Sequence, residues 1–297
     1  MITKATMHYA PLPQAKQVRI ALCQLLTSAD KNENIASAVA AVKRAASNGA
    51  KLVVLPEMWH CPYSNDSFPT YAEDIDGGDS PSVSALSKVA KETGVTLVGG
   101  SISERSQGSL YNTCCVFDKE GRLLAKHRKT HLFDIDIPGK ITFKESLTLT
   151  PGQGPTVVDT EEGRLGIGIC YDLRFPELAQ IYAQRGVQLI VYPGAFNMTT
   201  GPVHWELLQR ARAVDNQLFV AACSPARSLS LEGYQAWGHS TVVGPFAEVL
   251  ATTEHHPDIV YADLDYNQIV ERRTNMPLIQ QKRNDIYSVV DHSVYTE

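Results

Sequence analysis

The sequence lacks several features that would assign it to a specialised class of protein. No uninterrupted apolar run is long enough to span a bilayer, and the first residues, MITKATMHYAPLPQAKQ, lack the apolar core of a secretory signal. There is no basic excess either, since 27 Lys and Arg stand against 32 Asp and Glu, a net charge of −5. Proteins that bind nucleic acids normally carry a basic face. We therefore expect neither a membrane nor a nucleic acid as a partner.

Cysteine is scarce, and its spacing does not indicate a metal site. The six cysteines stand at positions 23, 61, 114, 115, 170 and 223, and no pair has the CxxC spacing of a zinc site. A chain of this size needs no disulfide staples. Most of the cysteines lie in apolar, strand-like runs (ALCQL, YNTCCVF, VAACS), where a free cysteine acts as a small hydrophobe. The sequence thus predicts no metal and a reducing compartment, cytoplasmic or mitochondrial.

What the chain does have is a core-forming composition and alternating strand and helix patterns. Hydrophobic residues make up 43% of its 297 residues, enough to bury a large core. In the first hundred residues, strands alternate with helices that end at glycine, which indicates crossover connections and a sheet covered by helices. The predicted elements are a strand over 18–24, a helix over 32–48, a strand over 51–57, a helix over 81–93 and a strand over 95–100.

The rest of the chain predicts two hairpins followed by a return of helices. YNTCCVFD-KEGR-LLAKHRK and PTVVDT-EEG-RLGIGIC have short polar turns between alternating runs. Helices are expected in PELAQIYAQRG and HWELLQRARAVDN, with strands in QLIVYP, LFVAACS and STVVGPFAEVLA. We interpret the chain as an N-terminal arm (1–17) followed by one α/β domain (18–297), although the pattern alone leaves two domains open.

Two charged segments are candidates for a functional site. In KLVVLPEMW a buried strand ends at a proline and Glu57 follows at once, and strand ends in α/β proteins are where sites are built. A solvated loop glutamate would look the same. In AKHRKTHLFD, a basic cluster around Lys129 is followed directly by apolar residues. That cluster is equally compatible with a solvated hairpin end, and no glycine-rich loop stands beside it to form a phosphate site.

The third candidate is Cys170 in RLGIGICYDLRFPE. A strand containing Gly166 and Gly168 delivers this cysteine to a junction at which Pro176 opens a helix. Such a strand-to-helix turn is the geometry of a nucleophile elbow, with a reactive side chain on a sharp turn and backbone N–H groups nearby. The alternative is a buried structural cysteine like Cys23.

Together, these segments resemble the three signature segments of the nitrilase, or carbon–nitrogen hydrolase, superfamily. PEMW, HRKTHLFD and GICYDLRFPEL occur in the family's order and spacing, and the resemblance covers about residues 18–290. It implies a four-layer αββα sandwich that associates as a homodimer. It also implies a triad of Glu57, Lys129 and Cys170, with no metal or organic cofactor.

The resemblance extends to the Nit2-like ω-amidase branch of the superfamily, through HLFDIDIPGKITFKES, YPGAFNMTTGPVHWELLQRARAVDNQ and WGHSTVV. It implies substrates that are ω-amides of 2-oxo dicarboxylic acids, 2-oxoglutaramate and 2-oxosuccinamate. It also implies that Glu145 supports the triad. Trp59 and His60 depart from the pattern, and we expect Trp59 to reshape the pocket beside Glu57.

The implied chemistry is covalent hydrolysis through a thioester. Cys170 attacks the amide carbon, Glu57 takes and returns the proton, and Lys129 with the backbone N–H of Tyr171 stabilises the oxyanion. Because a free cysteine has a pKa of about 8.5, Lys129 is expected to favour its thiolate. The histidines at 127, 131 and 204 are interpreted as structural, with a cysteine–histidine dyad as the alternative.

The far carboxylate of such a small-molecule amide substrate needs a cation or several donors. Arg174 and Tyr63 are candidates by their nearness in sequence to Cys170 and Glu57, although Arg174 is as compatible with an ion pair to Glu177 or Asp172. Within the superfamily, the alternatives are an amidase acting on deaminated glutathione and an N-carbamoyl hydrolase. Outside enzymes, the alternative is a binding module, which the presence of all three triad candidates disfavours.

Overall fold

Two six-stranded sheets form the centre of the molecule. The computed structural model describes residues 9–228, 230 and 233–294. The first sheet has the strand order β14-β1-β2-β3-β4-β5, in which β1, β2 and β3 run parallel and the others pair antiparallel. Its strands are β1 (Gln17–Gln24), β2 (Leu52–Val54), β3 (Thr96–Ser106), β4 (Ser109–Phe117), β5 (Leu123–Arg128) and β14 (Asp258–Asp265).

The second sheet repeats this plan with the later part of the chain. Its order is β13-β12-β11-β10-β9-β8, with β9, β10 and β11 parallel at the centre. Its strands are β8 (Thr156–Thr160), β9 (Gly163–Ile167), β10 (Leu189–Pro193), β11 (Phe219–Cys223), β12 (Thr241–Val243) and β13 (Val249–Thr252). The two predicted hairpins are β4–β5 and β8–β9, and both predictions are confirmed.

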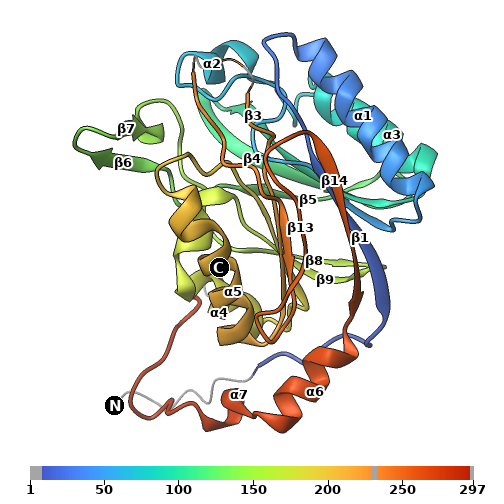
Figure 1. Cartoon of the computed structure of the whole chain (residues 1–297), viewed down its shortest axis with the longest axis vertical. Coiled ribbons are helices and arrows are strands. Elements are labelled where there is room, and N and C mark those ends of the chain that lie inside the picture. The colour runs from blue at the N-terminus through green and yellow to red at the C-terminus, as the bar shows by residue number, and fades with distance from the viewer. Residues whose placement is uncertain (1–8, 229, 231–232, 295–297) are drawn as a thin grey trace.

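Helices cover the outer face of each sheet. Helices α1 (Lys31–Ser47) and α3 (Pro81–Thr93) pack on the first sheet, and α4 (Pro176–Gln184) and α5 (Gly201–Asn216) pack beside the second (Figure 1). The sheets contact each other through β1 with β11 and β3 with β10. One apolar cluster fills the space between the sheets, and a second lies between the first sheet and its helices. The predicted four-layer αββα sandwich is confirmed.

Local signals account for the helix ends. The Asp30 side chain accepts hydrogen bonds from the N–H groups of Asn32 and Glu33, so α1 begins one residue earlier than the apolar spacing predicts. Ser80 caps α3 in the same way, and Gly94, with φ of +65°, ends it. The prediction of a helix over 81–93 is confirmed at both ends.

A small hairpin stands apart from the two sheets. Strands β6 (Asp134–Ile137) and β7 (Ile141–Lys144) pair only with each other and project to the left in Figure 1. The hairpin was not predicted, because its four-residue strands are too short to show a clear alternation. It matters for the site because Glu145 follows β7 directly.

Both ends of the described chain lie against α4. The N–H of Ala10 donates to the carbonyl of Gln184 (2.7 Å), and Arg185 binds Asp291 near the other end. The first eight residues of the predicted arm lie outside the described residues, and the division of the chain at residue 17 stays a prediction.

Between β14 and the C-terminus the chain forms two short helices, α6 (Asn267–Asn275) and α7 (Leu278–Gln281). Among the described residues, no helix is both long and apolar enough to cross a membrane.

Candidate active site

Cys170 lies on a sharp turn between β9 and α4. It begins a single helical turn, Cys170–Arg174, with φ of +46°, a conformation that non-glycine residues adopt rarely and at a cost. Close packing surrounds the turn, since a Cβ at Gly168 would stand 2.5 Å from the Tyr192 ring and one at Gly194 would stand 3.2 Å from the Cys170 Cα. Only glycine leaves the backbone this room. The predicted elbow geometry is therefore present, and the residue Cys170 is 3% exposed.

Glu57 follows β2 and is buried among hydrogen-bond donors. Its Oε1 accepts from Lys129 Nζ (2.9 Å) and Asn112 Nδ2 (2.8 Å), and lies 3.4 Å from the Tyr63 hydroxyl. Its Oε2 accepts from the backbone N–H of Ala195 (2.8 Å). The next residue, Met58, is held at φ of +47° with its N–H on the Ser101 hydroxyl, which fixes the direction of the carboxylate. Glu57 is thus a positioned carboxylate, and the alternative of a solvated loop residue is wrong.

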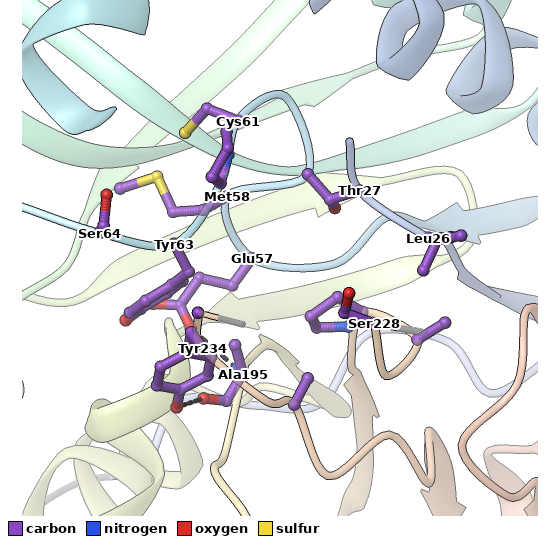
Figure 2. A pocket seen from close by; sticks show the side chains of 15 residues that line it. Leu26, Thr27, Glu57, Met58, Cys61, Tyr63, Ser64, Ala195, Ser228 and Tyr234 are labelled. Atoms are coloured by element: carbon purple, nitrogen blue, oxygen red, sulfur yellow. Dashed lines mark hydrogen bonds between the residues drawn. The ribbon is translucent and has the colours of Figure 1, made fainter. Parts of the chain in front are cut away.

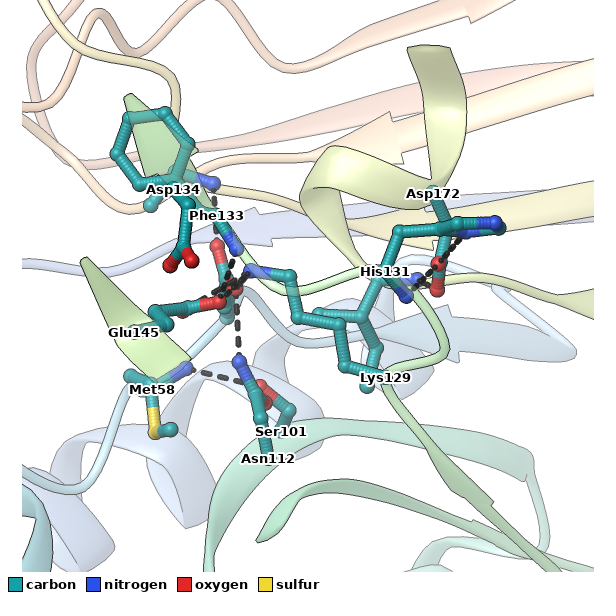
Figure 3. A network of polar contacts seen from close by, with 12 residues as sticks. Met58, Ser101, Asn112, Lys129, His131, Phe133, Asp134, Glu145 and Asp172 are labelled. Atoms are coloured by element: carbon teal, nitrogen blue, oxygen red, sulfur yellow. Dashed lines mark hydrogen bonds and ion pairs between the residues drawn. The ribbon is translucent and has the colours of Figure 1, made fainter. Parts of the chain in front are cut away.

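Lys129 links Glu57 to a second buried carboxylate, Glu145. Its Nζ lies 3.0 Å from Glu145 Oε1 and 2.9 Å from Oε2 (Figure 3). Glu57, Lys129 and Glu145 are each at most 1% exposed. Glu145 is held in turn by the N–H of Phe133 (2.7 Å) and the Tyr63 hydroxyl (2.7 Å). We call Glu57, Lys129 and Glu145 the Glu57 cluster.

The basic segment around Lys129 divides between two faces. Along β5 and its extension, successive side chains point to opposite sides. Lys126 and Arg128 turn to one side and bind the buried Glu104, at 3.0 Å and 2.7 Å. His127, Lys129 and His131 instead bind partners at the site. The interpretation of the segment as a solvated hairpin end is therefore wrong.

The two histidines serve Asp172, two residues after the nucleophile. Asp172 Oδ2 lies 3.2 Å from His127 Nε2 and accepts a hydrogen bond from the backbone N–H of Ile169 (2.9 Å). Asp172 Oδ1 lies 2.7 Å from His131 Nδ1 and accepts a hydrogen bond from the backbone N–H of His131 (2.9 Å). We call Asp172, His127 and His131 the Asp172 cluster. Because its bonds go to Asp172 and to the backbone just before Cys170, the structural interpretation of both histidines is supported over a cysteine–histidine dyad.

Opposing influences act on the pKa of Cys170. Burial and the charge of Glu57 raise the pKa of the Cys170 thiol well above its ordinary value, and the opposing influence of Lys129 is smaller. Burial alone would lower the pKa of Lys129, but Glu145 and Glu57 together raise it, so the ammonium stays charged. Lys129 therefore favours the thiolate, as expected, but its influence on the pKa of Cys170 is smaller than that of burial and Glu57, so the thiol stays protonated at rest.

The residues predicted around the triad fall into two groups. Tyr171 directly follows Cys170 and Tyr63 contacts both carboxylates, so the fold brings both residues to the site. Arg174 lies on the same turn, with its guanidinium 4.6 Å from the Phe196 ring centre and 3.2 Å from His204 Nδ1. It makes no ion pair with Glu177 or Asp172, and its buried Nε has no hydrogen-bond partner among the described residues. Burial lowers the pKa of Arg174, and the unpartnered Nε leaves its guanidinium with a donor to spare on the turn that carries Cys170.

Trp59 does not shape the site as expected. Its ring is buried in the cluster between the first sheet and its helices, and its Nε1–H donates to the carbonyl of Gly99 (2.8 Å). The neighbouring His60 is also buried, and burial lowers its pKa to about 3. Both departures from the family pattern are therefore accommodated in the core.

Three contributors to the site were missed from the sequence: Asn112 on β4, Ala195 after β10, and Tyr234. The Tyr234 ring stacks on Tyr63 with ring centres 4.5 Å apart, and its hydroxyl donates to the carbonyl of Ala195. The sequence held one signal for Ala195: it stands just after the predicted strand QLIVYP, and functional sites form at the ends of such strands.

Potential metal ligands gather elsewhere in the molecule. Within the described part of the chain, Glu254, His255 and His256 hold three ligand atoms within 4.8 Å of one another, in the loop between β13 and β14. At the site around Cys170, the positive charge nearest to the carboxylates belongs to Lys129.

Known proteins resemble this chain over nearly its whole length. The sequence model of the carbon–nitrogen hydrolase family matches residues 19–274. The chain belongs to this family. This carbon–nitrogen hydrolase is 64% identical to a chloroplastic omega-amidase of Arabidopsis thaliana, over 95% of the chain and 76% of that protein. It is 57% identical to the human omega-amidase NIT2, over 91% of the chain and 97% of the relative.

Solved structures agree with the sequence relatives. The crystal structure of Saccharomyces cerevisiae Nit3, described as a member of branch 10 of the nitrilase superfamily, superimposes with a TM-score of 0.84 at 43% identity. The match covers 93% of this carbon–nitrogen hydrolase and 99% of that chain. The resemblance drawn from the three sequence segments is confirmed.

Proposed function

We propose that the protein is an ω-amidase that hydrolyses the terminal amide of 2-oxo dicarboxylic acid monoamides such as 2-oxoglutaramate and 2-oxosuccinamate. The observation that carries the proposal is the Glu57 cluster, a charged group buried beside a cysteine on a strained turn. Buried charges of this kind are costly to keep for structure alone and are concentrated at catalytic sites. Two relatives that are 57% or more identical carry the name omega-amidase.

In the first half of the reaction, Cys170 is the nucleophile. The raised pKa of Cys170 keeps the resting thiol protonated, so its proton passes to Glu57 as sulfur attacks the amide carbon. The oxyanion forms against Lys129 and the backbone N–H of Tyr171. Glu57 then gives the proton to the departing nitrogen, the C–N bond breaks, and ammonia leaves a thioester on Cys170.

In the second half, the same groups act on water. Glu57 takes a proton as the water oxygen attacks the thioester carbon, and the C–S bond breaks as the proton returns to sulfur. Glu145 contacts Lys129 but is also tied to Phe133 and Tyr63, so its proposed role is to orient the ammonium.

Arg174 is the proposed anchor for the free carboxylate of the substrate, with Tyr63 beside the reacting amide. The guanidinium stacks on Phe196 and has donor capacity beyond its contact with His204. A planar, partly buried guanidinium of this kind suits a carboxylate. Tyr63 lines a cavity of about 330 Å³ beside the β6–β7 hairpin, and Asn197 and Thr199 line the same cavity. This hairpin-side cavity is the proposed entrance for the substrate.

Ammonia release from 2-oxoglutaramate and from deaminated glutathione, measured side by side on one preparation, tests the substrate class. We expect 2-oxoglutaramate to have the higher kcat/KM. If deaminated glutathione turned over about a hundred times faster, a difference of nearly 3 kcal/mol in transition-state binding, the ω-amidase proposal would be wrong. The same assay on an N-carbamoyl amino acid tests the remaining alternative of the family.

Arg174→Met tests the carboxylate anchor. We expect KM for 2-oxoglutaramate to rise roughly 10²-fold, because loss of a charge-assisted hydrogen bond costs about 1.5–3 kcal/mol. Arg210→Met, on the exposed face of α5, is the matched control and should leave KM unchanged. If KM did not change in Arg174→Met, another group would hold the carboxylate.

We also propose that the protein is a homodimer located in the cytoplasm or mitochondria. Val203 and Leu207, four residues apart on α5, are 59% and 62% exposed, and an apolar stripe of this kind favours self-association. Sedimentation at micromolar concentration should give a dimer, and Leu207→Lys should weaken it; a monomeric wild type would contradict the proposal.

The six free cysteines support a reducing compartment, which imaging of the tagged full-length chain tests.

A further inference from the structure

A second cavity reaches Glu57 from another side than the hairpin. It has a volume of about 270 Å³ and is lined by Glu57 and Ala195 together with Leu26, Met58, Cys61 and Ala226 (Figure 2). We call it the Glu57-side cavity. Neither Glu57 nor Ala195 lines the hairpin-side cavity, which is walled instead by residues such as Lys140, Phe143 and Asn197.

The stacked pair Tyr63 and Tyr234 separates the two cavities. Both rings line both cavities, and each hydroxyl is fixed, Tyr63 on Glu145 and Tyr234 on the carbonyl of Ala195. The Tyr63 hydroxyl also lies 3.4 Å from Glu57 Oε1, which puts the pair beside the Glu57 cluster. The Glu57-side cavity therefore reaches a triad residue directly, whereas the hairpin-side cavity borders the site through the two tyrosines.

The hydrogen bonds of Glu57 distinguish its two oxygens. Oε1 faces Lys129, Asn112 and Tyr63, whereas Oε2 accepts from the N–H of Ala195. A carboxylate oxygen can accept two hydrogen bonds, so Oε2 has capacity for a second donor. Both ends of the Oε2 hydrogen bond, Glu57 and Ala195, line the Glu57-side cavity, whereas Lys129 and Asn112, which donate to Oε1, do not.

We propose that the Glu57-side cavity supplies the water that hydrolyses the thioester. This inference rests on the proposed covalent mechanism and adds a route to it. With the acyl group at the proposed hairpin-side entrance, that entrance is filled, and water needs another approach to Glu57. A volume of 270 Å³ holds several waters at about 30 Å³ each, and the hydroxyls of Thr27 and Ser228 give them polar partners.

The step balances without any further reactant. A water from the cavity donates its proton to Glu57 Oε2 as its oxygen bonds to the thioester carbon. The C–S bond then breaks, the electron pair stays on sulfur, and Glu57 returns the proton to Cys170. The products are the free carboxylic acid and the thiol.

Two substitutions that fill this cavity test the proposal with 2-oxoglutaramate as the probe. Ala226→Leu adds bulk to the wall, and Leu26→Trp adds it at a side chain that is 39% exposed, where folding is less at risk. Rapid quenching followed by intact-mass measurement gives the rates at which the acyl-enzyme forms and decays. Leu147→Trp, at a side chain 77% exposed that lines neither cavity, is the matched control.

We expect both variants to form the acyl-enzyme at the wild-type rate and to lose it about tenfold more slowly or worse, so that kcat and KM fall together while kcat/KM is kept. Decay within twofold of wild type in Leu26→Trp, or formation and decay slowed equally in both variants, overturns the inference. Failure of the proposed function looks different, because the wild type itself would then form no acyl-enzyme from 2-oxoglutaramate.

Discussion

The Glu57 cluster and the Asp172 cluster flank the same cysteine and draw on the same stretch of chain, residues 127–131, yet their charges are balanced differently. The Asp172 cluster has one carboxylate, whose hydrogen-bond partners are two histidine rings and the backbone N–H groups of Ile169 and His131. The Glu57 cluster has two carboxylates sharing one ammonium.

The pKa values follow this balance. Burial alone would raise the pKa of Asp172, but hydrogen bonds from His127 and His131 hold it well below its usual range. Burial raises the pKa of Glu145, and the charge of Glu57 adds to that effect, despite the attraction of Lys129. The Asp172 cluster therefore holds the turn in place, whereas the Glu57 cluster keeps surplus negative charge that can accept a proton.

The largest expected effect comes from removing the nucleophile between the two clusters. Cys170→Ala should lower turnover by roughly 10⁴-fold or more, the scale seen when a catalytic unit loses its nucleophile. Circular dichroism should show an unchanged fold. Cys115→Ala, at another buried cysteine, should keep turnover within about tenfold, since it only shortens a core side chain. A Cys170→Ala enzyme with wild-type rates would refute the nucleophile assignment.

Removing the shared cation should be the next most damaging change. Lys129→Met deprives the oxyanion of its charge and leaves Glu57 and Glu145 buried without a counterion, so we expect kcat to fall about 10²–10³-fold. Lys144→Met, at an exposed lysine just before Glu145, is the matched control for charge and length. Ammonia release measures both. A loss confined to KM would contradict a role in the transition state.

Neutralising the second carboxylate should have a smaller effect. Glu145→Gln keeps an oxygen for Lys129 and Phe133 but removes half of the charge that holds the ammonium, so kcat should fall about 10-fold to 10²-fold. Steady-state assays against Glu120→Gln, an exposed glutamate, give the comparison. A variant as inactive as Lys129→Met would mean that Glu145 reacts rather than orients.

Asp172→Asn should affect stability more than turnover. The amide N–H₂ replaces one carboxylate oxygen and cannot accept the hydrogen bonds made there, either those of Ile169 and His127 or those of His131, so the free energy of unfolding should fall by about 3 kcal/mol at pH 7. Because the folded pKa of Asp172 is depressed, its stabilisation is present above the unfolded value of about 3.9 and is lost as pH falls below it. Urea unfolding should therefore show the gap between variant and wild type shrinking below about pH 4. A gap that widened in acid would contradict this account of Asp172.

Patterns that lie within a short stretch of chain were predictable, and contacts across the fold were not. The limits of α3 follow from Ser80, Pro81 and Gly94, and the hairpins follow from their turns. Each triad residue looked ambiguous alone, and the family resemblance gave the joint assignment. Asn112, within β4, was missed because its contact with Glu57 joins strands far apart in the sequence, and the strand end before Ala195 did not say which side chain its N–H would bind. The influence of Lys129 on the Cys170 thiol was predicted in the right direction, but the larger opposing influences of burial and of Glu57 depend on the folded structure.

The pH dependence of Cys170 alkylation by iodoacetamide tests most directly whether the Glu57 cluster keeps the thiol protonated. Peptide mass mapping after timed quenching follows Cys170 alone, in the wild type and in Glu57→Gln. The wild type should show an apparent pKa clearly above the ordinary thiol value of about 8.5. The variant, relieved of one negative charge, should show a lower pKa although it no longer turns over substrate. A wild-type pKa at or below the ordinary value, or a higher pKa in Glu57→Gln, would contradict the account.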